Sequence, residues 1–359
     1  MLDAIDTFLD TCSAYLWGYV LLFGLLGTHL YLTVLLRVPQ RHLFTALRYY
    51  FSRGKGSEGH ISHFSSLMVS LAANVGTGNI LGVAVAITTG GPGAVLWCTL
   101  TGLLGMSSRY AESLLAIRFR TRDEKGEIVG GPMYALERGL KCKPLAVLFA
   151  VFTAIAAFGI GNATQVQSIG ESIGTAIDAL GGNVGASTIT FLGSTFTLCN
   201  LIVGIIVAII VALVSFGGIK RIGSVTEKLV PVMAIVYIVS TLIVILANAG
   251  HLGEAFGLIF KGAFNAEAAL GGAFGITIST SITKGIARGC FSNEAGLGSA
   301  PMAHAATSET NPVKQGFFGI FEVFMDTIVI CTLTSLVILC SGISINFGVD
   351  AAAELTISG

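Results

Sequence analysis

A glycine-broken polar stretch interrupts an otherwise apolar segment at two places in this chain. The first stretch is residues 74–79 (NVGTGN) and the second, 220 positions later, is residues 294–299 (EAGLGS). An unsatisfied backbone group in lipid costs several kcal/mol, so irregular backbone persists at membrane depth only where it lines a cavity. A pair of interrupted apolar segments in two corresponding halves is a pointer to a transporter's binding site. The pattern therefore predicts a membrane transporter.

The composition agrees with a membrane protein. Hydrophobic residues make up 53% of the chain and charged residues 11%, against about 25% charged residues in soluble domains. The 46 glycines suit close helix packing in a bilayer. The zero net charge gives no indication of a nucleic-acid partner. The seven cysteines include no CxxC pair, so we expect buried thiols and neither disulfides nor a cofactor.

Eight segments are apolar and, at about 20 residues or more, long enough to cross a hydrocarbon core of about 30 Å. We therefore expect an all-α integral membrane protein. The segments lie near residues 14–36, 63–90, 92–117, 145–170, 186–217, 229–249, 273–307 (broken) and 316–345.

Lysine and arginine collect in alternate loops. The loops at 37–62 and 117–143 and the turn at 217–228 are basic, whereas the connections between them are poor in basic residues. By the positive-inside rule the basic loops are cytoplasmic and the N-terminus lies outside. We expect a multi-pass protein of the plasma (inner) membrane, with a brief interfacial helix at 130–139 inside the second basic loop.

The two broken stretches belong to a longer internal repeat. The same offset of 220 residues superposes Ala86 on Ala306 and Pro92 on Pro312. Five spans separate the two copies, and an odd number of spans turns the second copy over in the membrane. The sequence therefore predicts an inverted repeat.

This repeat divides the chain into four parts. Residues 1–62 form an N-terminal transmembrane helix and a basic cytoplasmic loop, 63–249 the first five-helix repeat, 250–272 an extracellular connection, and 273–359 the start of a second repeat. The expected fold is a 5+5 inverted-repeat transporter with an extra N-terminal span, truncated after eight spans. We expect the 359-residue chain to be an N-terminal fragment that does not transport on its own.

Several motifs resemble the alanine or glycine:cation symporter family, also called the sodium:alanine symporter family. The resemblance implies a leucine-transporter-like fold, sodium as the coupling ion and alanine or glycine as the substrate. The last three helices of that fold, one of which contributes to a sodium site, have no counterpart here. The motifs are 73–79 (ANVGTGN), 90–95 (GGPGAV), 105–112 (GMSSRYAE), 130–134 (GGPMY), 161–165 (GNATQ), 220–227 (KRIGSVTE), 288–304 (RGCFSNEAGLGSAPMAH) and 321–327 (FEVFMDT).

The first break offers groups for both an amino acid and a cation. Breaking a helix frees amides that suit a carboxylate and carbonyls that suit a hard cation. We assign Gly76, Thr77 and Gly78 to the substrate carboxylate, Asn79 to substrate or cation, and the carbonyls of Asn74 and Val75 to the cation. The alternative is a glycine pair that only lets two helices cross closely.

The second break offers a similar set. Phe291 is a candidate pocket wall, Ser292 and Asn293 are candidate oxygen ligands, and the backbone at Gly296 is expected to be unwound. Glu294 is either a partner of the substrate amine or a cation ligand, or a structural carboxylate bonded to freed amides at the break.

Polar side chains on two other spans complete the candidate site. Asn162 and Gln165 lie three apart and either meet the substrate or bond to a neighbouring helix. Asp326 and Thr327 are candidate cation ligands. No catalytic residue is expected.

Four charged residues near the breaks are read as structural. Arg109 and Glu112, at (i, i+3), are expected to pair with each other. Lys284 and Arg288 precede the second break and are expected to line an outer vestibule.

These observations predict cation-coupled import of alanine or glycine by alternating access. The alternatives are another neutral amino acid such as glutamine, or proton coupling through Glu294, Asp326 or His304. An ion channel would need a continuous polar stripe, and an intramembrane enzyme a nucleophile with an orienting base; the sequence carries neither pattern.

Overall fold

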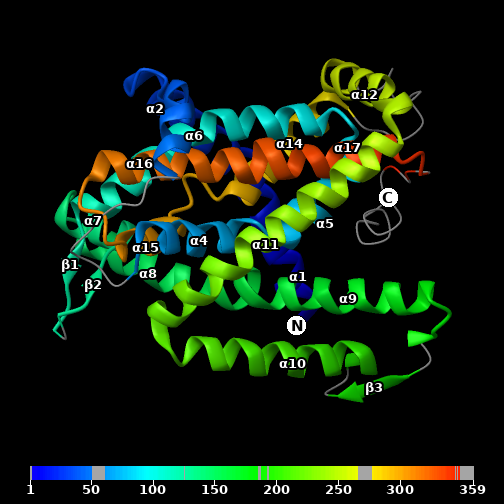
Figure 1. The fold of residues 1–359 in the computed structure, drawn as a ribbon, viewed down its shortest axis with the longest axis horizontal. Helices are drawn as coiled ribbons and strands as arrows, with labels where there is room; N and C mark the ends of the chain where they lie inside the picture. Colours follow the sequence, from blue (N-terminus) through cyan, green and yellow to red (C-terminus); the bar gives the residue numbers. More distant parts are fainter. Residues whose placement is uncertain are drawn as a thin grey trace.

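The computed structural model describes residues 2–50, 61–124, 126–184, 187–191, 194–265, 277–343, 345 and 347. These residues are mostly helical, as predicted, and two short β-hairpins join the helices (Figure 1).

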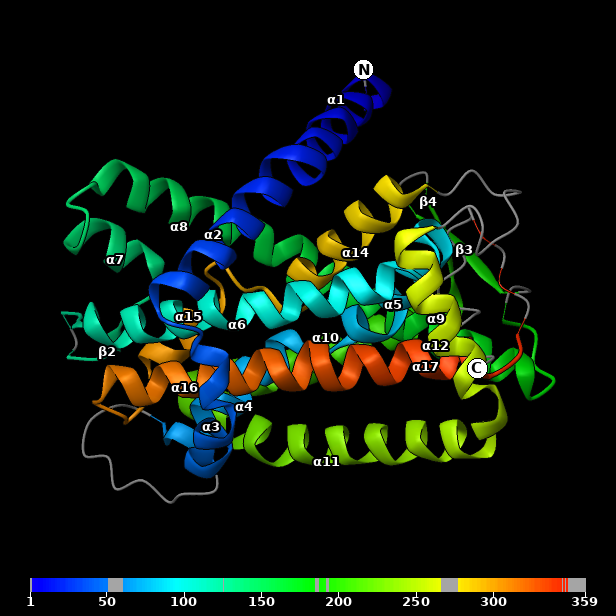
Figure 2. The ribbon, with the colours of Figure 1, turned by 90° about the horizontal axis from the view of Figure 1, so that it is seen from above.

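The N-terminal helices differ in polarity, since the second is apolar whereas the first and third are amphipathic. Helices α1 and α2 meet at a π-helical turn, η1, and α1 extends away from the rest of the molecule (Figure 2). The elements are α1 (Leu2–Tyr15), η1 (Leu16–Val20), α2 (Leu21–Leu35), the 3-10 turn η2 (Pro39–His42) and α3 (Leu43–Tyr50).

The first broken helix follows. Ser62 caps it, because the Ser62 Oγ accepts a hydrogen bond from the Ser65 amide at 2.9 Å. Two residues, Val75 and Gly76, separate its halves. The elements are α4 (His63–Asn74), α5 (Thr77–Gly90) and the long helix α6 (Ala94–Arg118).

The middle of the chain contains both hairpins. The predicted interfacial helix is present as α7. The elements are β1 (Thr121–Arg122), β2 (Ile128–Val129), α7 (Pro132–Arg138), α8 (Lys143–Phe158), the π-helical turn η3 (Gly159–Ala163), α9 (Thr164–Ala179), β3 (Thr188–Phe191), β4 (Ser194–Thr197), α10 (Leu198–Ser215), α11 (Gly218–Ala247), the 3-10 turn η5 (Ala249–His251) and α12 (Leu252–Phe264).

The second broken helix and one further long helix complete the described part. The elements are α14 (Ile278–Asn293), α15 (Ala300–Ala305), α16 (Pro312–Val323), the π-helical turn η6 (Phe324–Cys331) and α17 (Thr332–Cys340).

The two broken helices pack against each other crosswise. The first half of one contacts the second half of the other, since α14 packs on α5 and α15 packs on α4. The two helices therefore run in opposite directions. Helix α6 packs on α14, which leads into the second break, and on α16, which follows that break in the chain (Figure 1).

Five helical stretches of the described residues have the length and apolar composition to cross a membrane. They match five of the eight predicted spans and are Thr7–Leu35, His63–Gly90, Leu198–Ser215, Gly218–Ala247 and Pro312–Cys340. The other three predicted spans are interrupted or polar. The span at 92–117 is α6, which carries Arg109 and Glu112, the span at 145–170 contains η3, and the span at 273–307 is divided into α14 and α15.

Two predicted boundaries were wrong. Residues 188–191 and 194–197, predicted as the start of a span, form the antiparallel strands β3 and β4, because their β-branched and aromatic residues favour strands. The basic turn at 217–228 is mostly the first part of α11, which continues through Pro231. Within the predicted connection at 250–272 lies the helix α12, and residues 266–272 are outside the described residues.

The surfaces of α10 and α11 suit contact with lipid. In α10 only Val203 is buried, and α11 exposes large apolar side chains such as Leu229, Ile235 and Leu246. An exposed apolar surface of this extent is typical of an interaction site or a bilayer-facing helix.

Helix α12 meets the start of α6 through two glycines. A β-carbon on Gly262 would lie 2.8 Å from the Gly93 backbone nitrogen. We therefore expect Gly262→Ala to force the two helices apart and to lower the free energy of unfolding by roughly 1–3 kcal/mol, measured by denaturant titration of the detergent-solubilised protein.

Gly257→Ala is the matched control, since it makes the same change on the same helix. No atom lies within 4 Å of the added β-carbon at Gly257, so the better helix propensity of alanine should make this variant neutral or more stable by up to about 1 kcal/mol. Equal effects of the two variants would contradict a close α6–α12 contact.

Candidate functional site

The first break is short and is bridged by Asn79. Val75 is extended (φ −82°, ψ 100°), its side chain packs against a buried apolar cluster, and Gly76 is extended as well. The Gly76 amide donates to the Asn79 Oδ1 at 2.9 Å, and the Asn79 amide donates to the Gly76 carbonyl at 3.1 Å. Asn79 therefore caps the start of α5 in the manner of a capping box.

The Asn79 carboxamide also reaches a buried polar cluster. Its Nδ2 donates to the Asp326 Oδ1 at 2.6 Å and lies 2.9 Å from the Ser292 Oγ. The Ser292 and Thr327 hydroxyls donate to the Asp326 Oδ2 at 2.9 and 2.7 Å, and the Asn293 Nδ2 donates to the Thr327 Oγ1 at 3.1 Å. These five residues, buried to 2% exposure or less, form the Asp326 cluster.

The Asp326 carboxylate has only neutral partners in the part of the chain that the structure describes. No basic side chain there lies within ion-pair distance of it. Arg288 acts on it electrostatically without forming an ion pair, and a buried charge that lacks a paired counter-charge is costly. Nearby, the Asn74 Nδ2 lies 3.5 Å from the Asn293 carbonyl, and the Asn74 Oδ1 is buried without a hydrogen-bond partner. Carboxylate, hydroxyl and amide oxygens at a helix break are the donors that a hard cation prefers.

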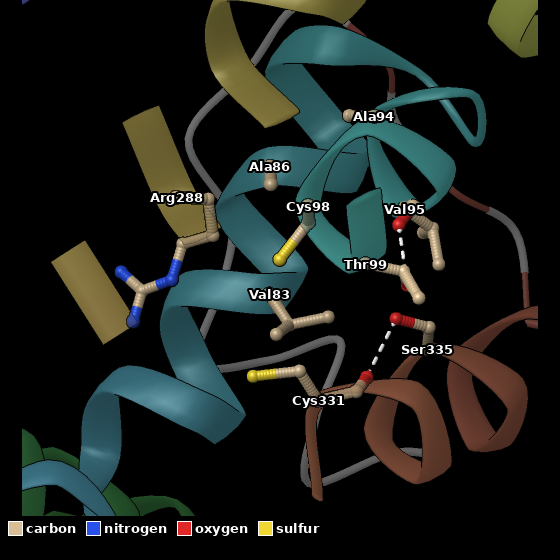
Figure 3. Close-up of a pocket in the computed structure, with 9 residues that line it drawn as sticks. All are labelled: Val83, Ala86, Ala94, Val95, Cys98, Thr99, Arg288, Cys331 and Ser335. Carbon is tan, nitrogen blue, oxygen red and sulfur yellow. Dashed lines mark hydrogen bonds between the residues drawn. The ribbon is translucent and has the colours of Figure 1, made fainter. Parts of the chain in front are cut away.

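A small cavity lies beside the Asp326 cluster (Figure 3). Its volume is about 10 Å³, and Val83, Cys98, Cys331 and Ser335 are among its lining residues. The Cys331 Sγ lies 3.4 Å from the Asn79 Nδ2 and 3.3 Å from the Ser292 Oγ. The cavity has room for about one water molecule, so an amino acid does not fit there.

Gln165 occupies the N-terminus of α5. Its Oε1 accepts hydrogen bonds from the Thr77 Oγ1 at 2.5 Å and from the Thr77 amide at 3.3 Å. A β-carbon on Gly76 would lie 3.3 Å from the same oxygen, so glycine permits the approach. The Gln165 oxygen thus makes the contacts that were predicted for a substrate carboxylate.

Asn162 is not brought to the break. It lies in η3 and is exposed, while Gln165 is half-buried. The predicted common face assumed an α-helix, but a π-helical turn inserts an extra residue and changes which positions align. No sequence motif predicted this π-helical turn.

Phe291 and Arg288 line a neighbouring groove, and Arg288 also contacts Gly78. The Arg288 guanidinium donates to the Gly78 carbonyl, and its central carbon lies 5.0 Å from the centre of the Phe291 ring. The Trp17 and Phe291 ring centres are 6.0 Å apart. In Figure 3 the guanidinium points away from Cys98 and Cys331.

The second break is longer and contains left-handed backbone. Glu294, Gly296 and Gly298 have φ values of 51°, 85° and 82°. The Glu294 carboxylate accepts a hydrogen bond from the Ser299 hydroxyl, and Gly296 is exposed beside Leu25 of α2. Glu294 and Gly296 therefore do not join the Asp326 cluster. The partner of Glu294 is the Ser299 hydroxyl and not a freed amide, so neither of its two predicted roles is decided.

Two charged residues of α6 hold the ends of the second break. The Arg109 Nη2 donates to the Asn293 carbonyl at 2.5 Å, and the Glu112 Oε1 accepts from the Gly298 amide at 3.1 Å. A cation thus meets the carbonyl end of α14 and an anion meets a freed amide, which matches the helix dipoles. The predicted Arg109–Glu112 pair is confirmed at 3.7 Å.

Arg109 is anchored by a second carboxylate that sequence reasoning did not connect to it. The Arg109 Nε lies 3.4 Å from the Glu322 Oε2, and the His304 Nε2 lies 2.9 Å from the Glu322 Oε1. Gln315 contacts the His304 Nδ1 at 2.5 Å. The side chains of Arg109, Glu322, His304 and Gln315 are fully buried. Together they tie α6, α15 and α16 to one another.

Comparison with known proteins identifies relatives along almost the whole chain. The model of the sodium:alanine symporter family matches residues 2–358. An uncharacterized transporter of Haemophilus influenzae is 44% identical over 340 residues, which cover 94% of this chain and 70% of the relative. The sodium/alanine symporter AgcS of Methanococcus maripaludis is 45% identical over 341 residues, covering 93% and 70%. The probable sodium/glutamine symporter GlnT of Bacillus subtilis is 35% identical over 343 residues, covering 95% and 67%.

Removal of either partner of the buried Arg109–Glu322 pair should destabilise the protein. Arg109→Gln or Glu322→Gln leaves a buried charge without its partner, so each should lower the free energy of unfolding by roughly 3–5 kcal/mol. The double variant should lose less than the sum of the two, by at least about 0.5 kcal/mol, because the two side chains contact each other.

The exposed pair His251–Glu254, 3.8 Å apart, supplies the control. Glu254→Gln should change the free energy of unfolding by about 0.5 kcal/mol or less. Strict additivity of the Arg109 and Glu322 variants in denaturant titrations would refute an energetic link between them.

Proposed function

The chain belongs to the sodium:alanine symporter family, a family of transporters and not of enzymes, and we propose that it imports alanine or glycine together with sodium. The observation that carries this proposal is the Asp326 carboxylate, buried beside the first helix break among neutral oxygen and nitrogen groups. Such a carboxylate is suited to reversible binding of a cation, because a permanent basic partner would compete with that cation for the carboxylate.

Sodium is proposed to bind at the Asp326 cluster. Asp326 supplies the charge, and the Ser292 and Thr327 hydroxyls, which now donate to it, can turn their oxygens toward a cation. The Asn74 side-chain oxygen, which has no hydrogen-bond partner, and the carbonyls at the break are further ligands. Neutralisation of the buried carboxylate would contribute to the affinity for the cation.

The substrate carboxylate is proposed to bind at the N-terminus of α5. The amides of residues 76–78 carry the positive end of the helix dipole. Gln165 now places a neutral oxygen there, and a carboxylate would replace it because a charged acceptor bonds more strongly. Asn79 contacts both this helix start and the Asp326 cluster, so it is positioned to link amino acid and sodium.

Transport is proposed to proceed by alternating access in an inverted-repeat, leucine-transporter-like fold. The opposite directions of the two broken helices support this arrangement, since α14 packs on α5 and α15 on α4. In this scheme 63–249 is the first repeat and 273–359 belongs to the second. The N-terminus lies outside the plasma membrane, as the loop charges indicate.

A different neutral amino acid is the second candidate substrate. A relative that is 35% identical is named a probable sodium/glutamine symporter, whereas a 45% identical one is named a sodium/alanine symporter. The named substrate therefore differs among relatives of this similarity. Proton coupling through Asp326 would use the same cluster. Uptake of labelled alanine, glycine and glutamine by the full-length protein in proteoliposomes, under sodium and under proton gradients, separates these cases.

Asp326→Asn should abolish the sodium dependence of uptake. The variant keeps the shape of the side chain but removes its charge, and the loss of one strong ionic contact lowers cation affinity by roughly tenfold or more. Glu254→Gln, on the exposed face of α12, should leave uptake unchanged. Sodium-stimulated alanine uptake that persists in Asp326→Asn would place the cation elsewhere.

Gln165→Glu should raise the KM for the amino acid. A fixed carboxylate at the start of α5 competes with the substrate carboxylate, and we expect an increase of roughly tenfold, against a change below about threefold for Gln165→Ala. Gln167→Glu on the same helix is the control, since Gln167 is exposed and bonds to Glu171. A KM that is equal in Gln165→Glu and the control would exclude substrate from this helix start.

A further inference from the structure

A groove of about 310 Å³ lies between α14, α5 and η1, outside the Asp326 cluster. Arg288 and Ser292 are one turn apart on α14, so the groove is adjacent to the cluster through a single helical turn. Its volume is within the range of small-molecule sites. Its lining includes Trp17, Gly82, Thr89, Lys284, Arg288 and Phe291.

Arg288 in this groove has no carboxylate within ion-pair distance among the described residues, although the buried Asp326 acts on it electrostatically. Its guanidinium donates to the Gly78 carbonyl and lies over the Phe291 ring, and its Nε has no hydrogen-bond partner. The side chain is half-buried. An arginine presents a planar fork of donors that matches a carboxylate, and a half-buried fork satisfied by one carbonyl and a ring leaves donors for a further acceptor.

Two glycines of α5 make room for the guanidinium. Gly78 and Gly82 are four residues apart and thus lie on one face of the helix, and a β-carbon on either would overlap the Arg288 side chain. The guanidinium therefore lies against bare backbone directly beside the helix start to which we assign the substrate carboxylate.

The remaining lining favours an anion with a small apolar part. Lys284 adds a second positive charge, and no lining residue is acidic. Trp17 and Phe291 form a tilted aromatic pair, 6.0 Å between centres, on the apolar side of the groove. Two positive charges and no acidic group favour an anion such as a short carboxylate over a cation.

We propose that this groove is a docking site for the carboxylate of the entering amino acid, and that Arg288 binds it. The inference rests on the proposed function for the identity of the ligand. The carboxylate replaces the Gly78 carbonyl as the acceptor of the guanidinium, and Arg288 moves away from the start of α5. Docking thus holds the amino acid next to its transport site before sodium and substrate are enclosed together.

The two tryptophans of the chain provide a direct test. Trp17 lines the groove and Trp97 does not. Trp97→Phe, combined with phenylalanine at any tryptophan beyond residue 359 of the full-length protein, leaves Trp17 as the fluorescent reporter. The full-length Trp97→Phe protein is titrated without sodium with propionate, which has the carboxylate but no amine, and with alaninamide, which has the amine but no carboxylate. We expect propionate to change the Trp17 emission in a saturable way and alaninamide not to do so.

Arg288→Gln in the Trp97→Phe background should weaken the propionate response by roughly tenfold or more, and Lys284→Gln by a smaller factor, since Lys284 is more exposed. Arg288→Lys keeps the charge without the planar fork and should give an intermediate loss. Asn79→Ala, which alters the transport site and not the groove, should keep the Trp17 response. Gel filtration identifies any variant that does not fold.

The outcomes separate the two proposals. Equal responses to propionate and alaninamide, or none to propionate, overturn the docking site even if Arg288→Gln does not fold. A propionate response that is unchanged in Arg288→Gln overturns the role of Arg288. A Trp17 response as expected, in a protein that takes up no alanine under any gradient, supports the groove as a carboxylate site and refutes the proposed transport function.

Discussion

Peptide groups freed at two interrupted helices are the constraint on which the rest of this structure depends. The freed groups find hydrogen-bond partners of a different kind at each of the two breaks. At the second break, ionised side chains of α6 bind the freed groups, Arg109 the Asn293 carbonyl and Glu112 the Gly298 amide. At the first break the partners are the neutral carboxamides of Asn79 and Gln165. Charged partners bond more strongly, so the second break is the anchored one and the first is open to exchange with ligands.

Helix α6 acts as the fixed support of this arrangement. Arg109 connects it to Glu322 on α16, and His304 connects Glu322 to α15. A buried ionic network contributes less to stability than its contacts suggest, because its groups lose their hydration. Its clearer effect is geometric: it sets the end of α14, and therefore the positions of Ser292 and Asn293 in the Asp326 cluster.

The sequence predicted both breaks and named Asn79, Ser292, Asp326 and Thr327 as candidate cation ligands, but not the hydrogen bonds among them. Glycines inside apolar segments were a sufficient signal for both breaks, and Asp326 was conspicuous as an acid in an apolar span. The contact of Asn79 with Asp326 joins residues 247 positions apart, and no local pattern encodes it. The position of Asn162 was unexpected for a different reason, because the π-helical turn η3 changes the face on which it lies. The contacts of Arg109 with Glu322 and with the Asn293 carbonyl were not predicted, because helical spacing indicates only its pair with Glu112 at i+3.

The thiol of Cys331 gives the Asp326 cluster a second chemical character. Its sulfur lies 3.3–3.4 Å from Ser292 and Asn79, so a soft ligand borders a set of hard oxygen donors. Thiolates bind soft metals such as Cu(I) in preference to the alkali and alkaline-earth ions that oxygen ligands select. A soft metal ion that reached this cavity would thus meet a sulfur donor beside the oxygen ligands that we propose for sodium.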